Sequence, residues 1–319
     1  MIMTGRERFY ALLNGEKYDR MPVGFWMHFP KERFYGEESV KAHLEYFEKT
    51  KTDIAKVMTE YLMPCDHSIK CADDWRNVPV YDENAPFIQA QAKLLREIFA
   101  QRTDLVPMAT LHGVVASASH TLLGAPEYDS IGRYAQMYHL RTDPEAFEAG
   151  LRNIAQSLCS MEDAFLKAGA EGIYYAALGG ESDVFTEEEH ARYIAPLDRM
   201  VMQHAYDAGA KFVVLHVCKP KADIKRFAGY PCDIVNWGVR ESGTSLREGA
   251  KIFNGKVILG GFDHREGPMI EGDMEGIAAQ TRELSASMPD VRLILGSDCT
   301  LPGGLDYANI AAVAECLDA

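Results

Sequence analysis

The stretch KFVVLHVCKP, residues 211–220, decides the fold. Its apolar residues run without interruption to His216, Val217 and Cys218, and Pro220 ends the pattern. A short continuous apolar run is typical of a parallel strand that is covered on both faces. Because residues i and i+2 of a strand point to the same face, we expect His216 and Cys218 to lie side by side at the end of this strand.

Seven more apolar runs of this kind follow one another along the chain, separated by helical patterns. They cover residues 22–28, 53–60, 105–113, 172–180, 233–239, 256–263 and 292–299. Eight strands alternating with helices predict an α/β fold, the (β/α)8 TIM barrel. A doubly wound open sheet is the main alternative, but it requires a glycine-rich loop after the first strand, and MHFPKERFYGEE is not one.

The spacing of the runs also predicts the helices and the insertions. Asp143 and Pro144 are typical of an N-cap and a first helical residue, and Thr186 with Glu189 has the spacing of a capping box. We further expect a helix over residues 221–230. The whole chain, 1–319, is expected to form a single domain, with an N-terminal helical extension and with insertions after strands 2 and 3, at residues 61–104 and 114–171.

Composition narrows the range of partners. The chain has 319 residues, of which 47% are hydrophobic, and a net charge of −14. This charge repels phosphate backbones and anionic lipids, so we expect neither nucleic acid nor a membrane as partner. Residues 1–20 carry charges where a signal peptide needs an apolar stretch, so no export signal is expected. No apolar run reaches the roughly 18 residues of a membrane span, and the seven cysteines are an odd number. Reduced thiols in the cytoplasm are therefore expected.

The carboxyl ends of the predicted strands collect an unusual number of polar and aromatic side chains. Active sites of (β/α)8 barrels lie at this end. The residues there are Trp26, His28, Glu60, His112, Glu181, His216, Cys218, Asn236, Trp237, Asp263, His264, Asp298 and Cys299.

Three of these residues are metal donors. His216, Cys218 and Cys299 supply one imidazole and two thiolates, and a catalytic zinc needs three protein ligands and one open position. The alternative is that His216 is a hydrogen-bonded core residue and Cys218 a small buried apolar one.

The remaining cysteines give weaker evidence for a metal site. Cys65 and Cys71 could form a second cluster with His67, whereas those at 159, 232 and 316 are expected to be structural.

The strand-end residues and both ends of the chain resemble the uroporphyrinogen decarboxylase superfamily. The similarity begins at RERFYALLNGEKYDRMPVGFW, residues 6–26, and ends at LILGSDCTLPGGLDYANIAAVAEC, residues 293–316. The resemblance covers essentially the whole chain and implies a (β/α)8 barrel, in agreement with the strand count. Two chemical branches of the superfamily then have to be weighed.

One branch consists of metal-free decarboxylases that act on a tetrapyrrole with many carboxylates. Its members carry two arginines after the first strand and an aspartate after the second. Here Lys31 and Arg33 are present without the Arg-Gln-x-Gly-Arg motif, and Asp66 matches loosely. Tetrapyrrole decarboxylation is therefore the alternative function.

The other branch consists of cobamide-dependent methyltransferases, which resemble this chain more closely. Their zinc is held by His-x-Cys and a distant Cys, and His216, Cys218 and Cys299 match this pattern in order. The resemblance implies a Zn²⁺ cofactor and transfer of a methyl group between a corrinoid and a thiol or another small molecule. Such a site would deprotonate a thiol, whose ordinary pKa is about 8.5.

Further strand-end residues are candidates for supporting roles. Asp263, Asp298, His112 and Glu181 are candidate catalytic groups that hold the substrate or orient the metal ligands. The alternative for each is a capping or rim hydrogen bond. Trp26, Trp237 and Tyr174 are candidates for the corrinoid interface, against the alternative that they are packing residues.

The corrinoid itself is expected on a separate protein. A cobalamin module carries Asp-x-His-x-x-Gly, whereas FDHREGP, residues 262–268, has the wrong spacing, and no second α/β module is left over. We therefore expect a corrinoid-binding protein to dock over the barrel mouth. A third hypothesis is a non-catalytic barrel that binds a tetrapyrrole or a corrinoid protein.

Overall fold

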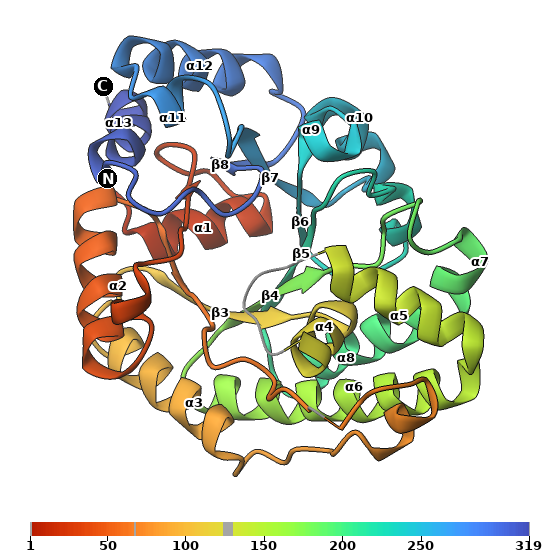
Figure 1. The fold of residues 1–319 in the computed structure, drawn as a ribbon. Helices are drawn as coiled ribbons and strands as arrows, with labels where there is room; N and C mark the ends of the chain where they lie inside the picture. The colour runs from red at the N-terminus through yellow and green to blue at the C-terminus, as the bar shows by residue number, and fades with distance from the viewer. Residues whose placement is uncertain (1, 67, 124–129, 319) are drawn as a thin grey trace.

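The computed structural model describes residues 2–66, 68–123 and 130–318, and within them the chain forms a nearly closed barrel of eight parallel strands (Figure 1). Neighbouring strands follow the order β1-β8-β7-β6-β5-β4-β3-β2, so β1 pairs with β8 and each later strand pairs with the next. The strands are β1 Val23–Gly24, β2 Ile54–Val57, β3 Val106–His112, β4 Gly172–Ala177, β5 Phe212–Val217, β6 Ile234–Trp237, β7 Val257–Phe262 and β8 Leu293–Ser297. The predicted (β/α)8 barrel is confirmed.

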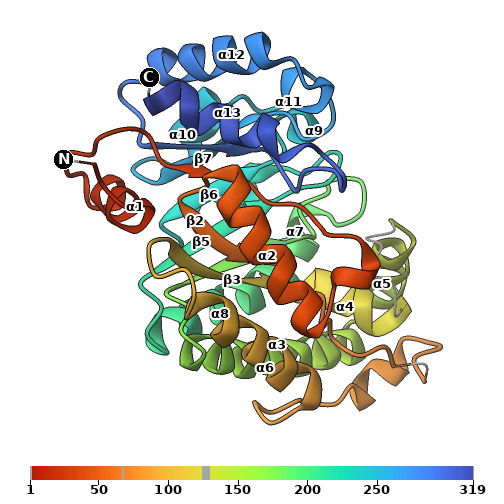
Figure 2. The same cartoon turned by 90° about the vertical axis from the view of Figure 1, so that its left-hand side faces the viewer.

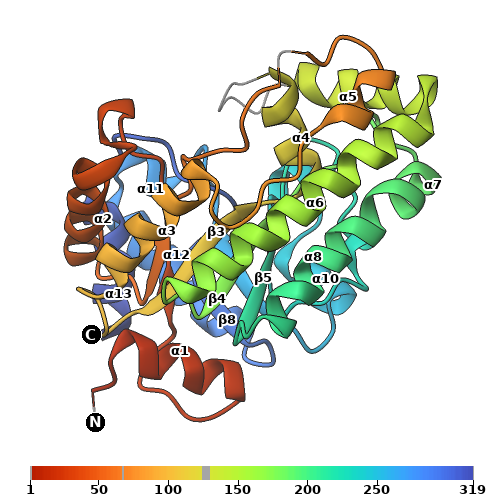
Figure 3. The ribbon, with the colours of Figure 1, turned by 90° about the horizontal axis from the view of Figure 1, so that it is seen from below.

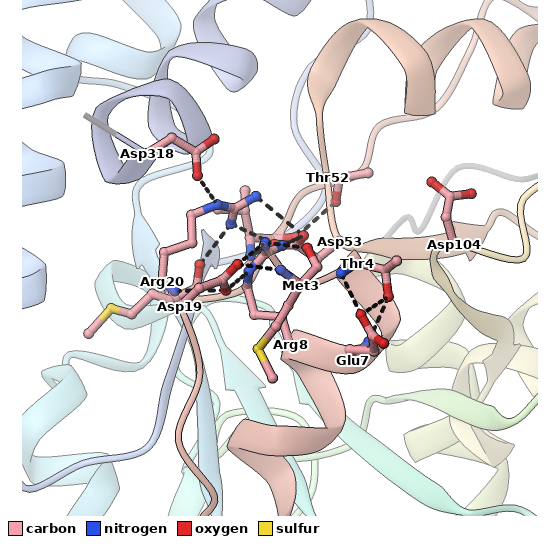
Figure 4. Close-up of polar contacts among 12 residues, drawn as sticks. Met3, Thr4, Glu7, Arg8, Asp19, Arg20, Thr52, Asp53, Asp104 and Asp318 are labelled. Atoms are coloured by element: carbon pink, nitrogen blue, oxygen red, sulfur yellow. Dashed lines mark hydrogen bonds and ion pairs between the residues drawn. The ribbon is translucent and has the colours of Figure 1, made fainter. Parts of the chain in front are cut away.

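The seam between β1 and β2 is closed mainly by Asp53, and the Thr52 hydroxyl adds a hydrogen bond to the Val23 carbonyl at 3.0 Å. The Asp53 backbone N–H donates to the carbonyl of Val23 at 2.8 Å, and its carboxylate accepts from the Val23 N–H at 2.7 Å. The side chain thus supplies the acceptor that a neighbouring strand would normally provide. Figure 4 shows Asp53 at the centre of a cluster of ionic contacts with Arg8 and Arg20.

Helices surround the strands (Figure 1). The longer ones are α2 Gly36–Thr50, α3 Pro86–Phe99, α6 Pro144–Lys167, α8 Ala195–Asp207, α10 Leu246–Ile252, α12 Met274–Ser287 and α13 Tyr307–Asp318. The shorter ones are α7 Glu187–Glu189, α9 Val239–Ser242 and α11 Pro268–Glu271. The Asp143 side chain caps α6 by accepting from the Ala146 N–H, and Thr186 forms the predicted capping box with Glu189.

Two helical predictions need correction. Residues 221–230 hold only the short 3-10 helix η4 Ile224–Phe227, because the segment begins with a turn in which Lys221 has a φ of 62°. The helix expected after Thr186 is interrupted by the π-helical turn η3 His190–Ile194. Pro196 follows this turn in the first turn of α8, where its missing N–H costs no hydrogen bond.

The N-terminal extension forms α1 Gly5–Asn14, which closes the amino end of the barrel. Phe9 and Leu12 are buried against the interior strand residues, and the Phe9 and Phe212 ring centroids lie 4.8 Å apart. Gly5 allows α1 to pack this closely against the barrel, since a Cβ at this position would lie only 2.8 Å from the Asp53 Cα. Figures 2 and 3 show α1 at the end of the barrel opposite α4 and α5.

The two predicted insertions are present. Between β2 and α3 the chain runs through the 3-10 helix η2 Asp73–Asn77, which buries Trp75. After β3 it forms α4 Val114–Leu123 and α5 Ser130–Thr142 before entering α6. None of the helices in the described residues is long and apolar enough to cross a bilayer.

Candidate metal centre

Three donor side chains meet at the carboxyl end of the barrel. His216 is on β5, Cys218 follows it at the end of that strand, and Cys299 follows β8. Their ligand atoms all lie within 4.8 Å of one another, and the Cys299 Sγ is 3.4 Å from the His216 Nε2. The structure therefore brings together residues that are 83 positions apart in the chain.

Asn236, on β6, fixes the tautomer of His216. The Asn236 side-chain NH₂ donates to the carbonyls of Leu259 and Ser297, at 2.9 and 3.0 Å. Its Oδ1 therefore faces the His216 Nδ1, 2.6 Å away, and must accept a proton from it. The lone pair of the imidazole is left on Nε2, which points toward Cys299. This is the arrangement that a metal-binding histidine requires.

The pKa values of the two thiols are shifted in opposite directions. The hydrogen bond from Cys218 holds the pKa of Cys299 well below its usual range, and the neighbouring His216 adds to this effect. The same hydrogen bond raises the pKa of Cys218. One neutral imidazole nitrogen and two sulfurs, one of them readily ionised, form a donor set that suits zinc.

A cavity of about 360 Å³ opens beside the three donors. The donors form part of its wall, and much of the remaining wall is apolar. The apolar part includes Met58, Ala116, Ala176, Leu178, Leu301 and Pro302. A ligand of a few carbon atoms fits this space, and its reactive atom would lie against the donor sulfurs.

Lys56 lies at the wall of this cavity and was not among the residues singled out from the sequence. It occupies an interior position of β2, on the same face as Ile54 and Met58, and it is only 2% exposed. Its amine lies 4.8 Å from the Trp26 ring centroid and 4.3 Å from that of Tyr174. Burial lowers the pKa of Lys56 to about 7.

The sequence of the chain identifies its family. The model of the family described as Uroporphyrinogen decarboxylase (URO-D) matches residues 65–319. The chain belongs to the uroporphyrinogen decarboxylase family. A search of curated proteins finds no significant match.

Solved structures share the fold of this uroporphyrinogen decarboxylase family member. A methyltransferase from Methanosarcina mazei has a TM-score of 0.77 at 16% identity, over 99% of this chain and 98% of the other. A B12-independent methionine synthase from Shewanella sp. W3-18-1 has a TM-score of 0.62 at 15% identity, over 94% and 97% of the two chains. At these identities the likeness establishes the barrel fold.

Of the four candidate catalytic residues, His112 reaches the cavity of this family member. It ends β3, is 8% exposed and lies edge-on to His120, with ring centroids 5.0 Å apart. Burial lowers its pKa well below the usual range. Two further histidines line the cavity: His28, whose Nδ1 is 2.6 Å from the Glu60 Oε1, and His264, which is buried.

The three candidate carboxylates do not line the metal cavity. Glu181 is buried in an ion pair with Arg133 and accepts from the Gly179 N–H at 2.8 Å. Asp263 and Asp298 line a separate pocket between the ends of β6 to β8 and the helices outside them. Burial raises the pKa of Asp298 to about 7. Asp298 accepts from the Val239 N–H at 3.0 Å, and Asp263 accepts from the Arg265 N–H at 2.7 Å.

The three aromatic candidates lie in different places. The Tyr174 ring lines the cavity and is stacked on His216, with centroids 5.3 Å apart, and its hydroxyl donates to the Asn236 Oδ1. Trp26 is buried in the barrel interior, edge-on to Tyr174. Trp237 is buried among the helices outside the barrel, and its Nε1 donates to the Thr244 carbonyl.

A second group of donors lies between α6 and α8. Cys159, Glu162 and His204 have ligand atoms within 4.8 Å of one another, and the His204 Nδ1 is 2.9 Å from a Glu162 carboxylate oxygen. This hydrogen bond joins the two helices, and burial raises the pKa of Glu162 to about 8. In the alternative cluster of Cys65, Cys71 and His67, the histidine lies outside the described residues.

Proposed function

We propose that this protein is a zinc-dependent methyltransferase that moves a methyl group between a corrinoid, carried by a separate protein, and a thiol or another small molecule. His216, Cys218 and Cys299 would hold the zinc. The observation that carries the proposal is the convergence of these donors beside a cavity, with the His216 Nε2 lone pair directed at the same point. Three protein ligands leave the fourth position that catalytic zinc sites keep open.

The roles of the chain's own residues follow from their contacts. Asn236 keeps the proton of His216 on Nδ1, and the apolar cavity wall orients a small substrate and excludes water. When bound, zinc would lower the pKa of a coordinated substrate thiol, so that the thiolate is the reacting form. The fold shared with a Methanosarcina mazei methyltransferase supports this assignment.

The remaining features of the proposal concern its setting. We propose that the corrinoid protein docks over the mouth of the barrel, where the cavity opens. We also propose a cytoplasmic location, since the structure places none of the cysteines of the described residues in a disulfide bond and a reducing compartment keeps thiols in this state. Asp263, Asp298 and Glu181 are assigned no chemical step, because each accepts a hydrogen bond from a backbone N–H of a loop or helix.

The second candidate function is decarboxylation of a tetrapyrrole, which the name of the matching family favours. The two functions differ in their need for metal. Elemental analysis of the purified protein is expected to give about one zinc per chain, as a catalytic site requires. Zinc-free protein with tetrapyrrole decarboxylase activity would replace the methyltransferase proposal with this one.

Substitution of the ligands tests the site itself. We expect Cys299→Ala to lose the zinc and the methyl transfer together while keeping its circular dichroism spectrum. Cys316→Ala is the matched control, because this cysteine lies on α13 and contacts Arg282 and Ala278. Retention of full zinc and full activity by Cys299→Ala would rule out the proposed ligand set.

X-ray absorption at the zinc edge tests the open position. With a substrate thiol added, one new sulfur neighbour is expected at about 2.3 Å from the zinc. An unchanged spectrum with every thiol tested would contradict thiol activation at this centre.

A further inference from the structure

The donor group between α6 and α8 lies outside the barrel. Cys159 and Glu162 are three positions apart on α6, so their side chains lie on one face of this helix, and His204 is in the last turn of α8. One ligand atom from each residue lies within 4.8 Å of the other two. Figure 3 shows the two helices side by side. Since α8 leads into the amino end of β5, His204 is at the end of the barrel away from its mouth.

Glu162 has an oxygen that the described residues leave without a partner. Its side chain is 0% exposed, and its Oε2 is 2.9 Å from the His204 Nδ1. Its Oε1 has no hydrogen-bond partner in the part of the chain that the structure describes. A proton on Oε1 would remove the charge but would itself lack an acceptor there. A buried carboxylate oxygen without a partner is costly, so a cation bound at this carboxylate would supply what the protein does not.

His204 has the surroundings of a metal ligand. Its Nδ1 faces Glu162, and its Nε2 lies 3.6 Å from an oxygen of Asp163. With its proton held on Nε2 by Asp163, the imidazole would direct the lone pair of Nδ1 toward Glu162. Carboxylates behind metal-binding histidines commonly have this role. Metal binding would then release a proton from Nδ1 and another from the Cys159 thiol.

The chemistry of the three donors restricts the ion. One imidazole, one thiolate and one carboxylate suit zinc, whereas magnesium and calcium prefer sites made of oxygen. The side chains of His204 and Asp163 are 31% and 40% exposed, so an ion can enter from solvent and water can complete the coordination. With one thiolate in place of two, this site should bind zinc more weakly than the centre in the barrel.

We propose that Cys159, Glu162 and His204 form a second zinc site, with water as the fourth ligand, which joins α6 to α8. The site fills only when free zinc is added, so the purified protein keeps the single ion of the barrel centre. It shares no ligand with that centre and does not rest on the function proposed above. Since the unfolded chain does not hold the three donors together, bound zinc stabilises the folded protein.

Zinc uptake by a protein without the barrel centre tests the second site. The variant Cys218→Ala/Cys299→Ala lacks both thiols of that centre. After dialysis against micromolar zinc, it is expected to hold about one zinc per chain, and the wild type about two, one for each ligand set. Adding Cys159→Ala should reduce the zinc in the double variant to nearly none. No uptake by the double variant, or equal uptake with and without Cys159→Ala, would overturn the second site.

Cys316→Ala in the same double variant is the matched control. Cys316 is also a half-buried cysteine on an outer helix, and it contacts the Ala278 carbonyl. This change should leave the zinc content unaltered. Loss of the zinc with Cys316→Ala as well would mean that the uptake does not depend on the α6 and α8 donors.

X-ray absorption at the zinc edge identifies the ligands of the second site. In the zinc-loaded double variant we expect one sulfur at about 2.3 Å and nitrogen or oxygen neighbours at about 2.0–2.2 Å. A spectrum without a sulfur neighbour would contradict the role of Cys159.

Thermal unfolding shows whether the zinc joins the helices. Added zinc should raise the unfolding temperature of the double variant, and Cys159→Ala should abolish the rise. The outcome is separate from that of the barrel centre. A wild type that holds one zinc, loses it with Cys299→Ala and takes up no second ion would support the barrel centre and refute this site. Zinc uptake by the double variant would support this site even if the protein transferred no methyl group.

Discussion

Buried charged side chains at the two ends of the barrel differ in their partners. At the amino end Asp53 accepts from the Val23 N–H and is paired with Arg8 and Arg20, so its buried charge is fully matched (Figure 4). At the carboxyl end Lys56 is buried equally deeply, but its amine contacts aromatic rings and a thioether. Matched charges at the first end hold the barrel together, whereas the amine at the second has no ion-pair partner in the described residues, and its burial disfavours the charged form.

The largest effect on stability is expected from breaking the matched cluster. Asp53→Asn should lower the free energy of unfolding by about 1.5–3 kcal/mol, because two buried guanidinium groups each lose one carboxylate partner. Arg8 keeps its contact with Asp19, and Arg20 keeps its contact with Asp318. Urea unfolding followed by circular dichroism measures the change. Zinc bound per folded chain should stay the same, because the cluster lies at the end of the barrel away from the metal ligands.

Asp104→Asn provides the matched control at the same end. Asp104 pairs with Arg102 at the surface and is half exposed, so its loss should cost less than about 1 kcal/mol. Equal losses in the two variants would show that the Asp53 cluster contributes no more than a surface ion pair.

The opposite outcome is expected for the buried amine of Lys56. Burial lowers the pKa of Lys56 to about 7, so between pH 7 and the ordinary lysine pKa of about 10.4 the unfolded chain binds more protons than the folded one. The wild type should therefore gain stability relative to Lys56→Met as the pH rises through this range. Below pH 7 the variant should be more stable, by up to a few kcal/mol.

Unfolding curves of both proteins at pH 6 and pH 9.5 measure this difference. A difference in stability that does not change between the two pH values would mean that the folded-state pKa of Lys56 is normal. The contrast between the two ends would then lie in packing and not in charge.

A smaller effect is expected from the residue that orients the histidine. Asn236→Leu should weaken zinc binding by about 10–100-fold, as substitutions of groups behind metal ligands do. Competition with a chromophoric chelator gives the affinity. Asn309→Leu is the control, because it also removes a buried amide, one that donates to the Met269 carbonyl away from the metal centre. Equal affinities in the two variants would contradict the role of Asn236.

Local patterns predicted most of the architecture. The eight apolar runs coincide with the eight strands, and the N-caps at Asp143 and Thr186 are where they were expected. Both depend on neighbouring residues, so a single sequence suffices. The helix expected at 221–230 was wrong, because turn geometry in a short connection outweighed helix propensity there.

The candidate site was predictable in part. The spacing of His216 and Cys218 placed both on one face of a strand, and the residues that line the cavity include them. Lys56 could have been found by the same rule, since it is a charged residue in the middle of an apolar run, on the same face as Ile54 and Met58. A lysine in such a run reads equally well as an outward-facing residue, so the sequence alone did not single it out.

The sequence by itself determined where the strands lie, which end of the barrel carries the reactive groups and which side chains can act as metal donors. These properties follow from periodicities of two and about 3.6 residues, which are local. Only the tertiary structure decided that Asn236 orients His216, that Asp53 closes the seam, and that Lys56 shares a cavity with the donors. Those arrangements join residues from different strands, and their geometry depends on strand register and barrel closure, which short-range patterns do not specify.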